Sequence, residues 1–428
     1  MSFKDDAQLY AREQQFGYLE GESDVLVISF AGLEGRPHFQ FYGTLKALGY
    51  NALFLSDQKK AWYNTGLACF GDGVEYTLYI LNHLTNYFDP DKIFLIGGSM
   101  GGHGALLFAS LLGKGHVLAL SPQVLLKPHY AWYPENEGDA RYTDLSQLSF
   151  ENNTLTVISS EFPLDVLSLS RIANVRCREG TFLVVAQQHN LAKVLKAKGL
   201  LAQFIAHWIR HREVAFFEPV ADGRLGAPYS EALEALLDAS YQAKWKDALP
   251  AADLFSLSQR NSHYLDCQIA LTYFFNGRFE ESLKFAEMST VKAPQYINAY
   301  VYYVANLAAM GVWHKALSFY DECVWLQVES GQPKDAFLVS CADALGKLRK
   351  RRAAIRVREH VREIGGNPGL QRGNTFQLGR LHFEVGALKK SREVFNALMD
   401  EGIDDWMSQR AAEFYLPELA AALAAASA

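Results

Sequence analysis

The first half of the chain alternates short apolar runs with longer stretches in which apolar residues recur at helical spacing. Such runs, rich in β-branched and large residues, predict buried strands, and the stretches between them predict helices. Strands are predicted at residues 24–30, 51–55, 92–96, 116–120, 154–159 and 181–186, with helices at 74–88, 191–211 and one that ends near 112. Because strands that alternate with helices pair in parallel, this α/β half should form a mostly parallel sheet with helices on both faces.

The second half lacks this alternation and is predicted to consist of helix pairs over residues 229–428, after a linker with proline and glycine at 216–228. Its small and aromatic residues repeat in three windows: Ala243, Trp245 and Ala248; Gly277, Phe279 and Ser282; Gly311, Trp313 and Ala316. Successive windows lie 34 residues apart, and a displaced copy recurs around residue 388. The pattern resembles tetratricopeptide (TPR) repeats, which implies an all-α solenoid that binds a protein partner or mediates self-association.

Composition and charge narrow the class of protein. The 428 residues carry a formal net charge of −6, which argues against general nucleic-acid binding. The five cysteines are scattered and form no C-x-x-C pair, so we expect neither a disulfide framework nor a metal site. No apolar run reaches the ~18 residues of a transmembrane segment, and the first residues lack a leader pattern. We therefore expect a cytoplasmic protein.

The most informative stretch is Gly97-Gly98-Ser99-Met100-Gly101, which fits G-x-S-x-G between a predicted strand and a predicted helix. In a nucleophile elbow the serine takes a strained backbone conformation, and small neighbours let the strand and the helix pass closely. The alternative is a glycine-rich turn that holds a phosphate. No G-x-x-x-x-G-K-[ST] frame accompanies the stretch, so we favour the elbow.

The run S-M-G-G-x-G-A-L that begins at Ser99 resembles the serine motif of α/β-hydrolase-fold esterases and acyltransferases. That resemblance implies a Ser, acid, His order along the chain. Asp165 and His189 follow the strands predicted at 154–159 and 181–186, so we predict a triad of Ser99, Asp165 and His189. Glu161 is the alternative acid. His103, one helical turn after Ser99, is expected to pack or to line the substrate pocket rather than act as the base.

Two further groups are expected around the serine. The backbone N–H of Met100, at the start of a helix, should face a developing oxyanion, together with the N–H of either Gly32 or Leu33 after the first predicted strand. Trp62 and Tyr63 either line an acyl or sugar pocket or pack their loop onto the domain.

An irregular segment at residues 122–150 is rich in aromatic and charged residues and falls where α/β-hydrolases often insert a lid. One interpretation is a cap whose residues His129, Tyr130, Trp132 and Tyr133 face the substrate. The other is an exposed loop. The sequence leaves both open.

These features predict, over residues 1–215, a serine enzyme that works through an acyl-enzyme without a metal or cofactor, foremost a carboxylic ester hydrolase. One alternative is an O-acetyltransferase that acts on a bacterial surface or capsular glycan, with acetyl-CoA as an acyl donor. Another is a TPR scaffold with a non-catalytic hydrolase core. A basic unit that includes Arg349, Arg352 and Arg356 is either a solvated helix face or a surface for an anionic glycan or membrane.

Overall fold

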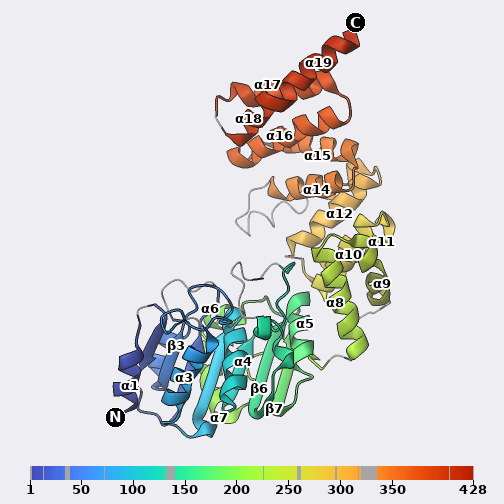
Figure 1. Ribbon diagram of the computed structural model, residues 1–428. Helices are drawn as coiled ribbons and strands as arrows, with labels where there is room; N and C mark the ends of the chain where they lie inside the picture. Colours follow the sequence, from blue (N-terminus) through green and yellow to red (C-terminus); the bar gives the residue numbers. More distant parts are fainter. Residues whose placement is uncertain are drawn as a thin grey trace. The chain divides into compact units, whose positions relative to one another are not determined.

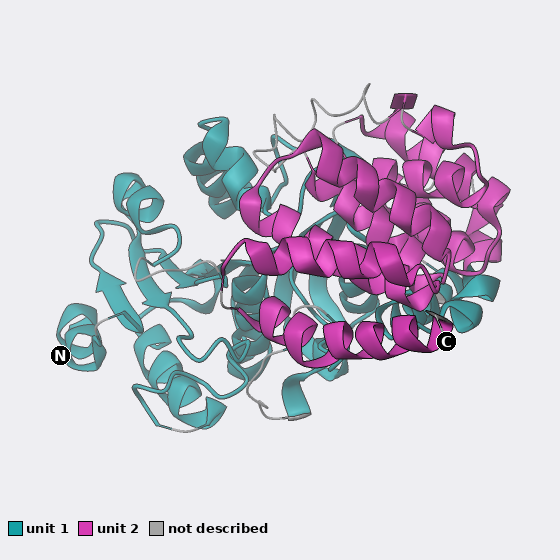
Figure 2. Ribbon diagram, turned by 90° about the horizontal axis from the view of Figure 1, so that it is seen from above, with its two compact units in different colours: residues 1–251 teal, residues 252–428 magenta. Residues whose placement is uncertain are grey.

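The computed structural model describes residues 2–12, 14–33, 39–71, 73–130, 133, 140–224, 226–257, 262–294, 296–316, 318–319, 335–403 and 405–427. The chain divides into two compact units, residues 1–251 and 252–428, which are coloured separately in Figure 2. Among the described residues, no helix combines the length and the apolar character that crossing a membrane requires.

The first unit is built on an eight-stranded sheet in the order β1-β3-β2-β4-β5-β6-β7-β8 (Figure 1). The strands from β2 to β7 pair in parallel, whereas β1 and β8 at the two edges are antiparallel to their neighbours. The predicted mostly parallel sheet is therefore confirmed. The strands are β1 (Phe16–Leu19), β2 (Leu26–Phe30), β3 (Asn51–Leu55), β4 (Ile93–Gly98), β5 (His116–Leu120), β6 (Phe150–Ser160), β7 (Cys177–Val185) and β8 (Pro219–Asp222).

Helices cover both faces of this sheet, each over its own hydrophobic cluster (Figure 1). One face carries α1 (Phe3–Tyr10), α3 (Val74–Thr85), α4 (Met100–Leu112) and α5 (Pro163–Ile172), and the other carries α2 (Tyr42–Leu48), α6 (Leu191–Ala197) and α7 (Leu201–His211). Side chains alternate along a strand, so Val27 and Ile28 of β2 lie in different clusters. Short 3-10 turns occur at Pro90–Lys92, Ala140–Tyr142 and Leu145–Gln147.

The division between the units falls later than the predicted linker at 216–228. Within that stretch, β8 pairs with the edge strand β7, and the following helix α8 (Ala227–Tyr241) packs against α5. Both elements therefore belong to the first unit, and the division falls within α9 (Trp245–Ser256).

The second unit is helical throughout its described residues, as the sequence predicts. From α10 to α17, each helix packs against the next one described. The helices are α10 (His263–Phe275), α11 (Phe279–Lys292), α12 (Ile297–Ala309), α14 (Ala336–Lys347), α15 (Arg351–Ile364), α16 (Pro368–Glu384), α17 (Leu388–Asp400), α18 (Trp406–Arg410), a π-helical turn (Ala411–Tyr415) and α19 (Leu416–Ser427).

Two positions that the repeat analysis aligned make the same contact. The hydroxyl of Ser282 in α11 donates to the carbonyl of Ala270, and the hydroxyl of Ser391 in α17 donates to the carbonyl of Gly379. Both bonds join a helix to the one before it across twelve residues, at 2.6 and 2.8 Å. The small residue at this position therefore fixes the approach of paired helices in both places, while the TPR identity stays a prediction.

A tight crossing joins β4 to α4 in the first unit. A Cβ atom on Gly97 would lie 2.1 Å from the carbonyl oxygen of Gly101, and a Cβ on Gly101 would lie 2.2 Å from the carbonyl oxygen of Phe30. Both contacts are with backbone, which has little freedom to move. The glycines of the G-x-S-x-G frame are therefore required by the spacing of β2, β4 and α4.

Replacing Gly101 with Ala should lower the free energy of unfolding by about 2–3 kcal/mol, because the added methyl group overlaps backbone atoms. Gly43→Ala in α2 is the matched control, since a Cβ there meets nothing within 4 Å. We expect the control to be neutral or stabilised by up to about 1 kcal/mol. Urea unfolding followed by circular dichroism measures both changes, and equal stabilities for the two variants would contradict this account of the crossing.

Candidate active site

Ser99 lies at the turn between β4 and α4 with φ 56° and ψ −124°. Positive φ is uncommon for a residue with a side chain, and such strain persists only where the surroundings enforce it. Here the backbone N–H of Ser99 donates to Leu120 of β5 at 2.9 Å, and the N–H of His103 donates to the Ser99 carbonyl at 3.1 Å. These bonds hold the serine outside both the strand and the helix, with its side chain at a cavity.

His189 and Asp165 meet Ser99 from the carboxyl ends of β7 and β6. Nε2 of His189 lies 3.0 Å from Oγ of Ser99, and Nδ1 lies 2.8 and 2.9 Å from the two carboxylate oxygens of Asp165. A carboxylate only accepts hydrogen bonds, so Nδ1 carries the proton and Nε2, which carries none, can accept one from the serine hydroxyl. The structure thus brings the three predicted residues into one hydrogen-bonded chain.

The burial of this chain increases from the histidine to the acid. The side chain of His189 is 28% exposed, whereas that of Asp165 is 3% exposed, in the first turn of α5. Ser160 donates its hydroxyl to Asp165 at 2.6 Å, which gives the buried carboxylate a second partner. Glu161, the alternative acid, lies in the bend between β6 and α5, and Asp165 is the residue whose carboxylate faces Nδ1.

The expected oxyanion donors have different surroundings. Met100 opens α4, so its N–H has no partner within the helix. The N–H of Gly32 donates to Oε1 of Gln40 at 3.1 Å, while Leu33 lines the same cavity as Ser99. The N–H of Gly32 is therefore already bound to the carboxamide of Gln40. A substrate oxygen would have to displace this carboxamide to accept a hydrogen bond from Gly32.

Gln123 is a contact of the serine that the sequence analysis missed. Its Oε1 lies 3.2 Å from Oγ of Ser99, so it is a second acceptor, besides Nε2 of His189, for the one proton of that hydroxyl, and its Nε2 lies 3.4 Å from Nε2 of His189. The residue is 5% exposed and follows β5 by three positions. Its position just after a strand could have indicated a site residue, because the other site residues also follow strands. A single glutamine at such a position, however, belongs to no recognisable motif.

His103 binds the backbone of Gln123 and does not line the cavity. The imidazole is fully buried, its Nδ1 donates to the backbone carbonyl of Gln123 at 2.6 Å, and its Nε2 lies 3.1 Å from the side-chain amide of Asn64. Burial lowers the pKa of His103 to about 4, so the ring is neutral near pH 7. A neutral Nε2 accepts a hydrogen bond. The Nδ2 group of Asn64 donates this bond when the oxygen and nitrogen positions of its side-chain amide are exchanged.

The two aromatic residues after β3 take different positions. The carboxylate of Asp57 accepts the backbone N–H groups of Ala61 and Tyr63 at 2.8 and 2.9 Å and so fixes their loop. Trp62 lines the cavity beside Ser99. Tyr63 is fully buried instead, with its hydroxyl 2.9 Å from the carbonyl of Ala31 and 3.0 Å from that of Leu55, so it packs the loop onto the sheet.

Described residues of the segment expected to form a lid bind side chains of α8. Nε2 of His129 lies 3.0 Å from a carboxylate oxygen of Asp238, to which Tyr130 donates its hydroxyl at 2.6 Å. Lys127 binds Glu234 on the same helix at 2.7 Å. His129 and Tyr130 therefore face an acidic helix rather than Ser99, because Asp238 supplies a partner for the polar atoms of the buried Tyr130 and the partly buried His129. Trp132 lies outside the described residues.

The cavity at Ser99 has a volume of about 710 Å³. Its walls come from the loops after β2, β3, β4 and β7 and from α6: Gly32, Leu33, Gln40, Trp62, Gly98, Ser99, Leu120, Gln188, His189, Asn190, Leu191, Ala192, Lys193, Val194 and Ala197. A space of this size admits a small molecule beside the serine. Within the described part of the chain, no three His, Cys, Asp or Glu side chains gather as metal ligands would.

Comparisons with known proteins give matches to solved structures only. No family model matches the chain, and no curated protein matches it by sequence. The capsule O-acetyltransferase of Neisseria meningitidis serogroup A matches with a TM-score of 0.33 and 15% identity, over 46% of this chain and 91% of that one. The serine hydrolase FphF of Staphylococcus aureus matches with a TM-score of 0.28 and 14% identity, over 43% and 85%. A chain titled MamA MSR-1 C2 matches with a TM-score of 0.25 and 12% identity, over 42% and 100%.

Proposed function

We propose that this protein is a serine enzyme that forms an acyl-enzyme on Ser99, foremost a carboxylic ester hydrolase. The observation that carries the proposal is the hydrogen-bonded chain from Ser99 through His189 to the buried Asp165. A serine hydroxyl is a weak nucleophile until a base within hydrogen-bond reach accepts its proton. The 3.0 Å contact with Nε2 of His189 places such a base in position.

The reaction follows from this arrangement. Oγ of Ser99 attacks the carbonyl carbon of the ester while its proton moves to Nε2 of His189. Asp165 stabilises the positive imidazolium and keeps the ring oriented, and the N–H of Met100 donates to the oxyanion. The imidazolium then returns its proton to the leaving alkoxide. Because Gln40 already engages the N–H of Gly32, the N–H of Leu33 is our choice for the second oxyanion donor.

Gln123 acts after acylation in this scheme. The acylated Oγ of Ser99 no longer carries a proton, so Oε1 of Gln123, which lies 3.2 Å from Oγ in the free enzyme, needs another donor. The attacking water must lie near Nε2 of His189, which is 3.4 Å from the carboxamide. The water oxygen bonds to the acyl carbon while one proton moves to Nε2 of His189, and the proton that stays on the water donates a hydrogen bond to Oε1 of Gln123. The bond from the acyl carbon to Oγ of Ser99 then breaks, and His189 returns its proton to Oγ. Gln123 thereby positions the molecule that releases the acyl group.

A second candidate function is transfer of the acyl group to a glycan hydroxyl. The cavity of about 710 Å³ supports it, because this space admits an acceptor much larger than water beside His189. The catalytic residues would be the same, with the glycan hydroxyl replacing water. In either case we propose a cytoplasmic enzyme whose helical second unit binds a partner in the manner of TPR repeats.

Ser99→Ala should abolish release of p-nitrophenol from p-nitrophenyl acetate, with a loss of about 10⁴-fold or more, because no other group supplies the nucleophile. His189→Ala should lose a similar factor while it keeps its fold. Ser110→Ala and His207→Ala are the matched controls and should retain activity. An inactive parent protein, or a fully active Ser99→Ala, would contradict the proposal and favour a non-catalytic core. A burst that turns over only after a glycan is added would favour transfer.

Gln123→Met should leave the burst of p-nitrophenol nearly unchanged and slow the steady-state rate by about 10-fold, the effect of one lost hydrogen bond in deacylation. Stopped-flow measurement separates the two phases, and Gln147→Met on the surface is the control. Equal losses in the burst and in the steady state would show that Gln123 has no separate role in the second step.

A further inference from the structure

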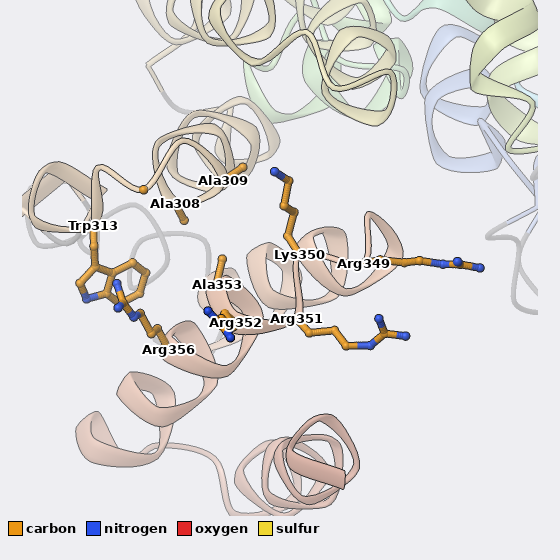
Figure 3. Close-up of a pocket in the computed structure, with 10 residues that line it drawn as sticks. Ala308, Ala309, Trp313, Arg349, Lys350, Arg351, Arg352, Ala353 and Arg356 are labelled. Carbon is orange, nitrogen blue, oxygen red and sulfur yellow. The ribbon is translucent and has the colours of Figure 1, made fainter. Parts of the chain in front are cut away.

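The second unit contains a cavity of about 400 Å³ that lies far along the chain from Ser99. It is formed by the end of α12, the turn that follows it, and the start of α15 (Figure 3). Its lining residues are Ala308, Ala309, Gly311, Trp313, Arg349, Lys350, Arg351, Arg352, Ala353 and Arg356. We refer to it as the α12/α15 cavity. Every one of these residues belongs to the second unit.

The lining is strongly cationic. Half of the lining residues carry a positive side chain, and no carboxylate is among them in this described part of the chain. Arg351 has an acidic partner, Glu384, at 2.7 Å. Arg352 and Arg356 are exposed, and no ion pair is recorded for either among the described residues. The chain as a whole carries a net charge of −6, so this concentration of positive charge is local and is not a consequence of composition.

Helix stability does not account for these charges. Cations in the first turn of a helix oppose its dipole, yet Arg351 and Arg352 are the first two residues of α15. The neighbouring Arg358 is different, because it is buried and binds Asp343 and Asn374 within the helical packing. Arg352, exposed in that first turn, therefore lies where an anion rather than a cation would be favourable, and Arg356 lies one turn further along the same helix.

The shape and chemistry of the lining indicate the class of anion. Arginine presents a planar fork that matches phosphate oxygens in pairs, and arginines outnumber lysine here by four to one. Figure 3 shows Arg356 extending toward Trp313, whereas Arg349 and Arg351 extend away from it. The indole of Trp313 offers a flat apolar surface, and Ala308, Ala309 and Ala353 leave space beside it. A sugar ring packs on such a surface through its apolar face.

We propose that the α12/α15 cavity binds a phosphate-bearing saccharide, with the sugar against Trp313 and the phosphate between Arg352 and Arg356. A space of about 400 Å³ is at the lower end of small-molecule sites, which suits one or two sugar units. The inference does not depend on Ser99, because binding here requires no turnover. It would give the second unit a ligand of its own, either a free sugar phosphate or a phosphorylated polysaccharide.

Isothermal titration of the full chain with glucose 6-phosphate tests the proposal. We expect binding that is at least 10-fold tighter than that of glucose or inorganic phosphate alone, and that weakens as salt is raised. Arg352→Glu together with Arg356→Glu should abolish it, and Trp313→Ala should weaken it by about 10-fold. Lys389→Glu with Arg392→Glu, an exposed pair on α17, is the charge-matched control and should bind normally. Circular dichroism melting checks that each variant keeps its fold.

Titrations with further ligands distinguish a free sugar phosphate from a phosphorylated polysaccharide, and both of these from an acidic peptide. Phosphorylated dextran that binds more tightly than glucose 6-phosphate identifies a polymer as the ligand, and the reverse order identifies the free sugar phosphate. The proposal is overturned if neither binds, if the Arg352 and Arg356 variant still binds, or if inorganic phosphate binds as tightly as the sugar phosphate. It is also overturned if hexaglutamate binds more tightly than both and loses affinity in the same variant, which would make this a surface for an acidic peptide.

Discussion

The close crossing of β4 and α4 at Ser99 is the constraint on which the rest of the candidate site depends. The backbone of Ser99 is held at a positive φ because β4 must end beside β5 while α4 turns back across the sheet. This geometry leaves no space for a Cβ at Gly97 or Gly101. The strained turn presents the serine hydroxyl to the cavity and places the N–H groups of a helix start beside it. Strain that the packing of the sheet enforces thus fixes the direction of a partly buried serine hydroxyl.

A second layer of buried polar groups holds the residues that surround the serine. Ser160 binds Asp165, neutral His103 binds the backbone of Gln123, and the carboxylate of Asp57 fixes the loop that carries Trp62. Burial raises the pKa of Asp57, and three backbone N–H groups oppose that shift by stabilising its charged form. Each supporting group lies at the carboxyl end of a parallel strand, in the loop after such a strand, or in the helix that follows. The sheet therefore orders the cavity through these loops, as parallel sheets commonly do.

The sequence predicts the sheet and the helical second unit well, because apolar periodicity depends on burial and burial is what builds these layers. It also predicts that residues after β4, β6 and β7 meet, since parallel strands end at one edge, and the structure brings Ser99, Asp165 and His189 together there. Gln123 and Gln40 were missed because a side-chain amide has no characteristic spacing. Tyr63 and His129 took partners that only the folded chain supplies, the carbonyls beneath the loop and Asp238 on α8. The stretch at 216–228, expected to be a linker, contains β8. The sequence did not predict this strand because an edge strand as short and exposed as β8 has no apolar pattern.

The central claim is that Ser99, activated by His189, is the nucleophile. Intact-mass spectrometry after incubation with an excess of an activated phosphonate ester tests this claim without knowledge of the natural substrate. The account predicts one phosphonyl group per chain, lost in Ser99→Ala, with labelling strongly slowed in His189→Ala. Labelling that persists in Ser99→Ala, or a folded parent protein that takes up no label at all, would contradict it.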